Sequence, residues 1–462
     1  MFNLYLNNYR NFVNQKFEFS RFNILIGENS SGKSSILKFL LMLKQSLQQN
    51  ELNLKFKGNL VDLGKYTDVI HQHKENKKIT FGFELGEEFD IFFEKNLLRN
   101  FPKEGDISEY KKILQNIFFG EKTFISFILD RNLNSHKSIE IKIKNKKVGE
   151  IEIKFRDNIN NIFAEQHQAD ITFKNNKGKF IIHKKLSYQK HAFLAFFSFR
   201  EIETNDINKQ YINYLSLSFT YLMGSIFNIQ YINPIESSPE RIFLEEDNKG
   251  LVPVRNLKDV INILNDTSIE DRDLLLNKLN KILQDFGIIK DLKVIKASNI
   301  SVFELQVKTV NSNIWCNIMD VGYGVSMQIP IFFQIIISEF STKKQEIISE
   351  LFTEKVETIL IEQPEIHIHP KLHAKFIETL AKIEKKNTYI IETHSEHIIR
   401  MLQVLVKNKT LKSSDVSIHY FKNGKDKFDV SKHEIEETGM LKPWLPEEFF
   451  DNSYHLSLQL LD

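Results

Sequence analysis

The sequence predicts an α/β protein with an antiparallel β region and a helical insertion, and without a long coiled coil. Three observations support this fold class. A short apolar run, a glycine-rich loop and an apolar helical stretch follow one another over residues 22–43. Apolar and charged residues alternate from Lys78 to Phe155, and apolar strands that end in polar residues return after residue 315. Strands between helices favour a parallel sheet, whereas strict alternation favours an antiparallel one.

The overall composition is that of a globular protein without a strong electrostatic preference. Hydrophobic residues make up 42% and charged residues 26% of the 462 residues, and 62 basic against 60 acidic residues leave a net charge of +2. This balance argues against a globally basic nucleic-acid binder. The single cysteine, Cys316, excludes intrachain disulfides and a cysteine-based zinc site.

The sequence shows no targeting or membrane segment. The N-terminal residues lack the charged and apolar regions of a signal peptide. The most apolar window, Ile329 to Ile337, is about half as long as a membrane span. We therefore expect a cytoplasmic protein without a membrane partner.

The order of patterns predicts three regions, 1–190 with the glycine loop and a β lobe, 191–310 with a helical insertion, and 311–462 with the rest of the α/β fold. Alternation predicts strands at 79–85, 139–144, 149–155, near 171 and at 180–182, with a hairpin between the second and third. Apolar spacings of three and four predict helices at 108–118, 208–227 and 255–286, the last interrupted at 266–268. No heptad pattern is sustained, which excludes long coiled-coil arms.

The glycine-rich loop is the most informative segment. It lies between the apolar strand Phe22–Ile26 and the apolar helix Ser34–Leu43, and it fits the pattern G-x-x-x-x-G-K-[ST]. With the residue that follows, the loop consists of Gly27, Glu28, Asn29, Ser30, Ser31, Gly32, Lys33, Ser34 and Ser35. N–H groups at a helix start lack partners within the helix and can face phosphates. Lys33 is then expected to reach the β- and γ-phosphates of ATP, and Ser34 to bind Mg²⁺. The alternative is a Gly/Ser turn that only caps the helix.

Two later strands end in polar residues that suit the same site. The first, Thr358–Ile361, is followed by Glu362-Gln363-Pro364-Glu365. A carboxylate at the carboxyl end of a strand lies where open α/β sheets bind ligands, so Glu362 is a candidate ligand for Mg²⁺. The second, Thr388–Ile391, leads into Glu392-Thr393-His394-Ser395. We expect His394 to sense a γ-phosphate or to orient the attacking water.

Three other groups of residues have simpler explanations than a second active site. His367, His369 and His373 lack a fourth zinc ligand, which favours a turn leading into a helix. Asp271 and Asp273 fall in a helical stretch with no strand before it, which favours a solvent-facing helix over a nuclease site. A solvated face, with DNA contact as the alternative, explains the lysines of the alternating strands, which are Lys142, Lys144, Lys146, Lys147, Lys184 and Lys185.

A second segment with glycines and a serine precedes the most apolar helix. It runs from Asp320 to Pro330 and contains Gly324 and Ser326. Such a helix start is another potential anion site. One chain needs only one of these elements for one nucleotide. Two chains that face each other use both, because each offers its serine-bearing helix to the triphosphate of the other.

Together these segments resemble the ATP-binding-cassette (ABC) ATPases of the RecF, SMC and overcoming-lysogenization-defect type. The greatest resemblance is to the AAA-family ATPases of bacterial anti-phage and mobile-element loci. It is carried by the glycine loop together with Leu6–Phe12, Asp320–Pro330, Glu362–Pro370, Thr393–Ser395 and Trp444–Asp451. The resemblance implies an ABC-ATPase head, a P-loop NTPase fold, for both ends of the chain.

The family mechanism implies a head-to-head homodimer, or a higher even oligomer, with two ATP molecules between the subunits. On this basis Gly324 and Ser326 would contact the γ-phosphate held by the partner. Glu362 would support Mg²⁺, and His394 would act as the switch. Because nucleotide affinity differs between closed and open dimers, binding and hydrolysis can drive a conformational cycle.

The sequence departs from the family pattern where related ATPases place a water-activating glutamate. This position is Gln363. An amide does not accept a proton at neutral pH, so either Glu365 activates water or hydrolysis is slow. The polar residue that usually follows the serine is displaced to Gln328, and Gln72 is the candidate for the lid glutamine.

Three functional hypotheses remain open. The first is an ATPase subunit that controls a separate effector, a nuclease, in an anti-phage defence complex. The second is a DNA-repair ATPase of the RecF or SMC kind that binds DNA directly. The third is an ATP-gated scaffold with very slow hydrolysis, and Gln363 motivates it.

Overall fold

The structure is a computed structural model that describes residues 2–47, 54–85, 124–131, 137–145, 149–156, 167–175, 180–188, 228–232, 239–244, 254, 256–296, 302–345, 357–383, 387–446 and 449. The chain forms two compact units that are interleaved in sequence. Unit 1 comprises Met1–Phe19, Glu28–Ile229 and Phe421–Val430. Unit 2 comprises Ser20–Gly27, Gln230–Tyr420 and Ser431–Asp462.

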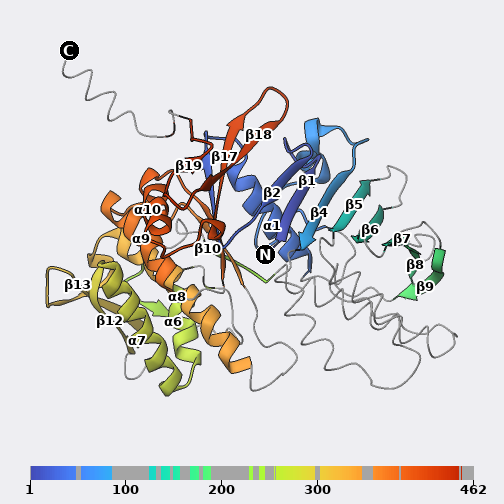
Figure 1. Cartoon of the computed structure of the whole chain (residues 1–462). Helices are drawn as coiled ribbons and strands as arrows, with labels where there is room; N and C mark the ends of the chain where they lie inside the picture. Colours follow the sequence, from blue (N-terminus) through green and yellow to red (C-terminus); the bar gives the residue numbers. More distant parts are fainter. Residues whose placement is uncertain are drawn as a thin grey trace, which may run out of the picture. The chain divides into compact units, whose positions relative to one another are not determined.

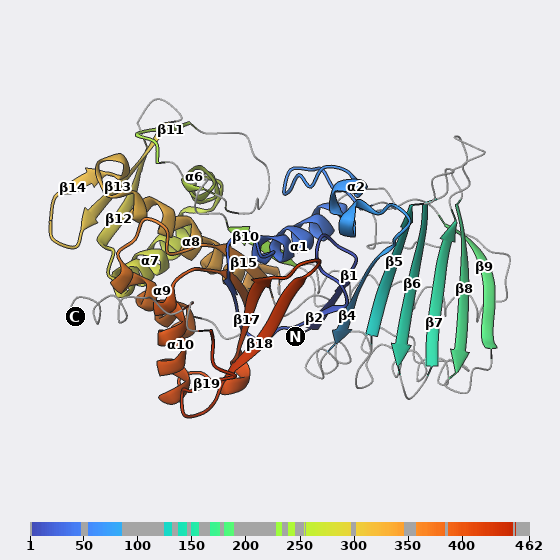
Figure 2. The same ribbon diagram turned by 90° about the horizontal axis from the view of Figure 1, so that it is seen from above.

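Unit 1 is built on an eight-stranded antiparallel sheet of order β2-β1-β4-β5-β6-β7-β8-β9, whose strands β4 to β9 run side by side in Figure 2. The strands are β1 (Phe2–Asn7), β2 (Gln15–Glu18), β4 (Ile79–Leu85), β5 (Phe124–Arg131), β6 (Lys137–Asn145), β7 (Gly149–Arg156), β8 (His167–Asn175) and β9 (Phe180–Tyr188). Its helices are α1 (Lys33–Leu47), α2 (Tyr66–Val69) and the 3₁₀ turn η1 (His71–His73).

Aromatic side chains join α1 to the sheet of unit 1. The Phe39 ring on α1 lies 4.9 Å from the Tyr9 ring and 5.3 Å from the Phe81 ring, centroid to centroid. Phe81 in turn stacks on Phe127 of β5 at 4.8 Å. Edge-to-face and offset contacts at these distances add to the burial of apolar area. They hold the helix that begins in the glycine loop against the antiparallel sheet.

Charged residues on the strands of unit 1 pair across neighbouring strands. The Lys142 ammonium lies 3.0 Å from the Glu152 carboxylate, and Lys144 lies 3.4 Å from Glu150. Within β7 itself, Lys154 also contacts Glu152, at 3.1 Å. Positive charge on this part of the sheet is therefore balanced locally, as in the solvated face predicted for it.

The main sheet of unit 2 has the order β10-β15-β16-β3-β17-β18-β19. Its strands are β3 (Phe22–Gly27), β10 (Ile229–Ile232), β15 (Thr358–Glu362), β16 (Thr388–Glu392), β17 (Val416–Asn423), β18 (Phe428–Ile435) and β19 (Leu441–Lys442), and β17 and β18 continue into unit 1. In register, β15, β16 and β3 run parallel. Their carboxyl ends therefore lie at the same edge of the sheet. The strands that form this edge are far apart in the sequence.

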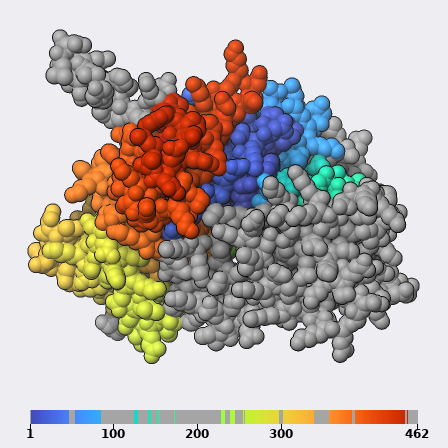
Figure 3. All heavy atoms as spheres, viewed as in Figure 1, coloured from blue at the N-terminus to red at the C-terminus, as the bar shows by residue number. Residues whose placement is uncertain are grey.

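A smaller sheet, β11-β13-β12 with β14 on β13, completes the strands of unit 2: β11 (Phe243–Leu244), β12 (Ile289–Lys296), β13 (Val302–Thr309) and β14 (Trp315–Asn317). The helices are α6 (Leu257–Asp266), α7 (Ile269–Phe286), α8 (Tyr323–Gln345), α9 (Pro370–Lys382) and α10 (Glu396–Lys407), with the 3₁₀ turns η3 (Ile318–Asp320) and η4 (Ser413–Asp415). Figure 1 shows α7 beside α8 and α9 beside α10. The surfaces of the segments coloured yellow to red adjoin one another in Figure 3.

Local sequence signals account for the helix ends in unit 2. The Asn256 side chain accepts from the Asp259 N–H at 3.0 Å and caps α6, and Ser268 caps α7 in the same way at 3.3 Å. Gly287 ends α7 in the left-handed conformation that glycine favours, with φ of 82°. Pro370 begins α9, where its missing N–H costs no helical hydrogen bond.

Most of the predicted elements lie within the described residues and are confirmed. The break predicted at 266–268 separates α6 from α7, and the predicted hairpin is β6–β7. The apolar window Ile329–Ile337 lies in α8 and is buried. The helices predicted at 108–118 and 208–227 fall outside the described residues. Among the residues described, there is neither a long coiled coil nor a helix with the length and apolarity that crossing a membrane requires.

Candidate functional site

The glycine loop connects β3 to α1, and the chain passes from unit 2 to unit 1 between Gly27 and Glu28. Gly27 and Gly32 have φ of 133° and 100°, values that L side chains rarely adopt. A Cβ atom on Gly32 would lie 2.5 Å from Cε2 of Phe428. The pattern therefore needs glycine at position 32 for both the backbone conformation and the space.

The first residues of the loop are held by the end of β17. Glu28 donates its N–H to the Phe421 carbonyl at 3.0 Å, and its Oε2 accepts the Asn423 N–H at 3.0 Å. The Asn423 amide donates to the Asn29 carbonyl at 3.1 Å. Glu28 and Asn29, predicted as part of the loop, thus attach the start of the loop to β17. The bonds use the Glu28 N–H, the Glu28 carboxylate and the Asn29 carbonyl.

The later residues fold back over the start of α1. Ser31 Oγ and Lys33 Nζ both donate to the Glu28 carbonyl, at 2.7 and 2.6 Å, and Lys33 is buried. Ser30 is exposed and has φ of 61°. Ser34 lies in the first turn of α1 and is half-buried. The ammonium group of Lys33 is therefore held within the loop by the Glu28 carbonyl.

Arg10 adds a second positive charge next to this loop, and the sequence analysis did not assign it to the site. Its Nη1 donates to Ser35 Oγ at 2.8 Å, in the first turn of α1. Its backbone is left-handed, with φ of 51°. That conformation is held because the Arg10 N–H donates to Val69 and the Arg10 carbonyl bonds His71 Nδ1 at 2.8 Å. Non-glycine residues in left-handed conformations cluster at functional sites. The backbone of Arg10 therefore indicates a place in the site, but only the structure reveals that backbone conformation.

The acidic turn, residues 362–369, follows β15 in unit 2. Glu362 is the last residue of β15 and pairs in register with Glu392, the last residue of β16. Paired residues of neighbouring strands point to the same face, so these two carboxylates lie side by side at the carboxyl edge. Glu362, which is half-buried, was predicted from the sequence, whereas Glu392, which is buried, was not.

The backbone of the acidic turn is tied to the strand beside it. Gln363 has a left-handed φ of 43°, and its N–H donates to the Glu392 carbonyl at 2.8 Å. Glu365 Oε1 accepts the His394 N–H at 2.7 Å. The structure thus brings together four residues that sequence analysis selected: Glu362, Gln363, Glu365 and His394. The His394 side chain is exposed at the end of β16.

The three histidines of the acidic turn and α9 have separate roles. His369 caps α9 by accepting the Lys371 N–H at Nδ1, 3.2 Å. His373 bonds Ser395 Oγ through Nδ1 at 2.9 Å and the Ile368 carbonyl through Nε2 at 3.2 Å. His367 is exposed. Within the described residues, no three His, Cys, Asp or Glu side chains form a group suited to a metal ion. The predicted turn into a helix is confirmed.

Burial lowers the pKa of His373 below its ordinary value of 6.5, and the nearby His397 acts in the same direction. The hydrogen bond to Ile368 and the charge of Glu365 oppose that effect. The neutral ring therefore donates Nε2–H to Ile368 and accepts the Ser395 hydroxyl at Nδ1. In this way α9 joins the acidic turn to the residues that follow His394.

The start of α8, also in unit 2, carries Gly324 and Ser326. Ser326 is fully buried, and its hydroxyl donates to the Tyr323 carbonyl of its own helix at 2.7 Å. A Cβ on Gly324 would lie 2.5 Å from the His367 carbonyl oxygen, so this glycine allows α8 to contact the acidic turn. The exposed residues here are Gly322 and Tyr323 rather than the two that were predicted.

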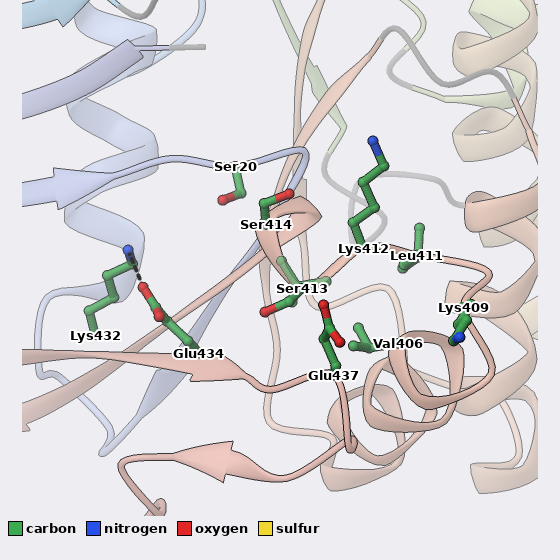
Figure 4. Close-up of a pocket in the computed structure, with 11 residues that line it drawn as sticks. Ser20, Val406, Lys409, Leu411, Lys412, Ser413, Ser414, Lys432, Glu434 and Glu437 are labelled. Carbon is green, nitrogen blue, oxygen red and sulfur yellow. Dashed lines mark hydrogen bonds and ion pairs between the residues drawn. The ribbon is translucent and has the colours of Figure 1, made fainter.

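A separate cleft of about 790 Å³ lies in unit 2 at the amino end of β3, opposite the edge that carries Gly27 (Figure 4). Ser20, Lys412 and Ser414 line it, with the ion pair between Lys432 and Glu434 at 2.8 Å. None of the residues predicted for the nucleotide lines this cleft. The cleft therefore lies apart from the glycine loop and the acidic residues that follow β15.

The residues present fit a nucleoside triphosphate with a magnesium ion. The loop combines backbone N–H groups at a helix start with the cations Lys33 and Arg10. Ser34 and Glu362 supply hydroxyl and carboxylate oxygens, which are the donors that Mg²⁺ prefers. A bound triphosphate would supply the electrophilic phosphorus, and the chain would supply charge and position.

Comparison with solved structures found distant similarity to heads of SMC proteins. One is the SMC head bound to the C-winged helix domain of ScpA, with 12% identity, TM-score 0.39, and coverage of 94% of this chain and 98% of that one. The SMC head from Thermotoga maritima has 10% identity, TM-score 0.35, and coverage of 93% and 97%. The head with an extended coiled coil, bound to the C-terminal domain of ScpA derived from Pyrococcus furiosus, has 10% identity, TM-score 0.40, and full coverage of both chains.

A search of curated proteins gave no significant match. The family model described as AAA ATPase domain matches residues 1–399, which is most of the chain and includes the glycine loop, the start of α8, the acidic turn and His394. The fold is accordingly the P-loop α/β fold that the loop pattern predicts, and an ATPase domain binds nucleotide. The chain belongs to the AAA ATPase domain family.

Proposed function

We propose that this protein is a Mg²⁺-dependent ATPase subunit that dimerises head to head on ATP and controls a separate effector. The observation that carries the proposal is the combination of a closed glycine loop at the start of α1 with a carboxylate pair and an exposed histidine at the ends of neighbouring strands. Membership of the ATPase family supports the same chemistry.

The proposed roles follow from position and chemistry. Lys33 and the backbone N–H groups of residues 27–35 bind the phosphates, and Ser34 and Glu362 hold Mg²⁺. His394, exposed after β16, senses the γ-phosphate in this proposal, and its backbone is fixed by Glu365. Glu365 Oε2 is buried and makes no hydrogen bond within the described residues. It is therefore the candidate proton acceptor for water, since Gln363 has no basic atom.

The proposed dimer places the start of α8 against the triphosphate of the partner. Gly322 and Tyr323 are the exposed residues there, so they make the first contact. Gly324 and Ser326 reach the γ-phosphate only if the Ser326 hydroxyl leaves the Tyr323 carbonyl. Closure of the dimer then requires a local change at this helix start, which ATP on the partner can stabilise.

The effector and its biological setting rest on motif resemblance. Asp271 and Asp273 lie on helix α7 without a preceding strand, as predicted, so they do not favour a nuclease within this chain. We propose a separate nuclease as effector and a bacterial anti-phage complex as setting. Co-purification of the protein expressed from its own operon would identify the effector, and a partner without nuclease activity would contradict this assignment.

The primary test of the proposal is Lys33→Ala. This variant removes the phosphate-binding cation but keeps the loop backbone, so ATP binding should weaken by at least about tenfold, equivalent to about 1.4 kcal/mol, and hydrolysis should disappear. Calorimetric titration of the magnesium–ATP complex and phosphate release measure these effects. Light scattering should show a dimer with ATP for the original protein and a monomer for the variant. Equal ATP affinity of both proteins would contradict the proposal.

A second candidate function is an ATP-gated scaffold with very slow hydrolysis, and Gln363 favours it. The Gln363 backbone is fixed to β16, which leaves an amide at the position that usually bears the general base. Gln363→Glu should then increase the rate of hydrolysis by about 10²-fold or more, as expected for a restored general base. Single-turnover rates with enzyme in excess would measure the change. No increase would indicate that Glu365 already performs this step.

A further inference from the structure

One buried glutamine connects the start of α8 to the acidic turn. Gln328 has no exposed surface, and its Nε2 donates to the Pro364 carbonyl at 2.7 Å. Its Oε1 is buried and makes no hydrogen bond within the described residues. Because β15 ends before Pro364, the sheet offers this carbonyl no ladder partner. A buried donor at this distance therefore fixes the turn to α8.

The same turn is held from the opposite side by β16. Gln363 N–H bonds the Glu392 carbonyl, and Glu365 bonds the His394 N–H. Gln363 and His367 both adopt left-handed conformations, with φ of 43° and 62°. Such a backbone persists only where surrounding contacts determine it. Loss of one of these contacts should allow the turn, and the carboxylates on it, to move.

The start of α8 rests directly on the acidic turn. Gly324 leaves room for the His367 carbonyl, which would lie only 2.5 Å from a Cβ at that position. The Tyr323 ring meets the His367 ring edge-on, with centroids 5.2 Å apart. Displacement of the helix start is therefore transmitted to the turn through packing, and Gln328 supplies the directional bond between the two.

We infer that Gln328 is a positioning residue that couples the start of α8 to the carboxylates of the acidic turn in the same subunit. This inference rests on the proposed function, because the coupling has a role only in the proposed ATP-dependent dimer. Contact of α8 with the nucleotide of the partner would set the position of Pro364 and, through it, of Glu362 and Glu365. Hydrolysis in one subunit then depends on occupancy of the other, and Gln328 touches neither nucleotide.

The chain provides a matched control on the same helix. Gln334 is also buried, and its Oε1 accepts the Val254 N–H at 2.8 Å, away from the acidic turn. At nearly constant volume, Gln328→Met removes the bond to Pro364, whereas Gln334→Met removes the bond to Val254 and a longer one of 3.4 Å to Ser338 Oγ. Thermal unfolding of both variants reports the general cost of that loss. A difference in hydrolysis between them, at similar unfolding temperature, reports the specific role of Gln328.

The experiment compares single-turnover hydrolysis and ATP affinity of the full-length proteins. Gln328→Met should lower the hydrolysis rate by about 10- to 100-fold, as for other residues that orient a reacting group through its partner. Its affinity for ATP should stay within about threefold, and its dependence on ATP concentration should lose cooperativity. Gln334→Met should keep the original rate and cooperativity.

The pH dependence of hydrolysis by Gln328→Glu distinguishes a positioning role of Gln328 from a purely structural one. A carboxyl group donates to the Pro364 carbonyl only when it is protonated, so hydrolysis by this variant should fall as pH rises through the pKa of the new group. The Gln328→Met variant should lack that limb. An unchanged rate in Gln328→Met, or equal losses in both methionine variants, would overturn the inference alone. Absence of Lys33-dependent hydrolysis in the original protein would overturn the proposed function as well.

Discussion

At the scale of single residues, the candidate site depends on backbone conformations that most side chains avoid. Gly27 and Gly32 in the glycine loop, and Gln363 and His367 in the acidic turn, all have φ between 43° and 133°. Glycine adopts such values without strain, whereas the two non-glycine residues need the hydrogen bonds and packing described above. The loop is therefore encoded locally, and the acidic turn is encoded by its neighbours.

The loop conformation predicts the effect of a methyl group at Gly32. Gly32→Ala would place Cβ against the Phe428 ring and force alanine to φ of 100°. We expect a loss of stability of about 1–3 kcal/mol and weaker ATP binding. Gly322→Ala is the control for stability, because its Cβ meets nothing within 4 Å. Urea unfolding of both variants and ATP titration of Gly32→Ala against the original protein test this; equal stability of the two variants, or unchanged ATP affinity of Gly32→Ala, would contradict the role assigned to Gly32.

At the scale of elements, α9 works as a connector between two strand ends. Its His373 bonds the acidic turn after β15 and Ser395 after β16. Helices in α/β proteins commonly pack on the sheet through apolar faces alone. Here a titratable group on the helix also fixes the two polar segments at the carboxyl edge. Protonation of His373 should therefore weaken the connection between these two segments.

The lowered pKa of His373 predicts how stability changes with pH. Between the folded pKa and the ordinary value of 6.5, the unfolded state binds more protons than the folded state. The free energy of unfolding should therefore decrease as pH falls below about 6.5. His373→Gln keeps a donor and an acceptor but does not titrate, so it should lose less stability over this range. Burial also lowers the pKa of His433, so the variant reduces the loss without abolishing it. Equal losses in both proteins would contradict this account.

At the scale of the whole molecule, the ATPase fold is assembled from distant parts of the chain. Parallel pairing joins β3 near the N-terminus to β16, and β16 to β15, although some 360 residues separate the paired Tyr389 and Phe22. Lys142 and Lys144 of β6 pair with glutamates of β7, so this part of unit 1 gives no support to direct DNA binding. The proposed oligomer instead uses the exposed start of α8.

That surface allows a test of dimerisation in which the subunit itself remains intact. Gly322→Arg adds a long side chain where a Cβ has open space, so the monomer should fold. The arginine would obstruct a partner that closes over α8, and ATP should no longer induce dimers. Asn277→Arg, on the exposed face of α7, is the matched control and should dimerise. Light scattering with and without ATP distinguishes them; an ATP-induced dimer of Gly322→Arg would exclude closure over this helix start.

The sequence by itself determined the glycine loop, the two strands with polar ends, the α6–α7 break and the β6–β7 hairpin. Each of these is specified within a few consecutive residues, by glycine conformation, apolar period or a capping side chain. Only the tertiary structure decided that Glu392 lies beside Glu362, that Arg10 reaches Ser35, that Ser326 is buried and that Gln328 holds Pro364. Those relations join residues 25 or more positions apart, or depend on which face of a helix is covered. Both the long-range contacts and the covered helix faces depend on how the whole chain folds, so no local sequence pattern predicts them.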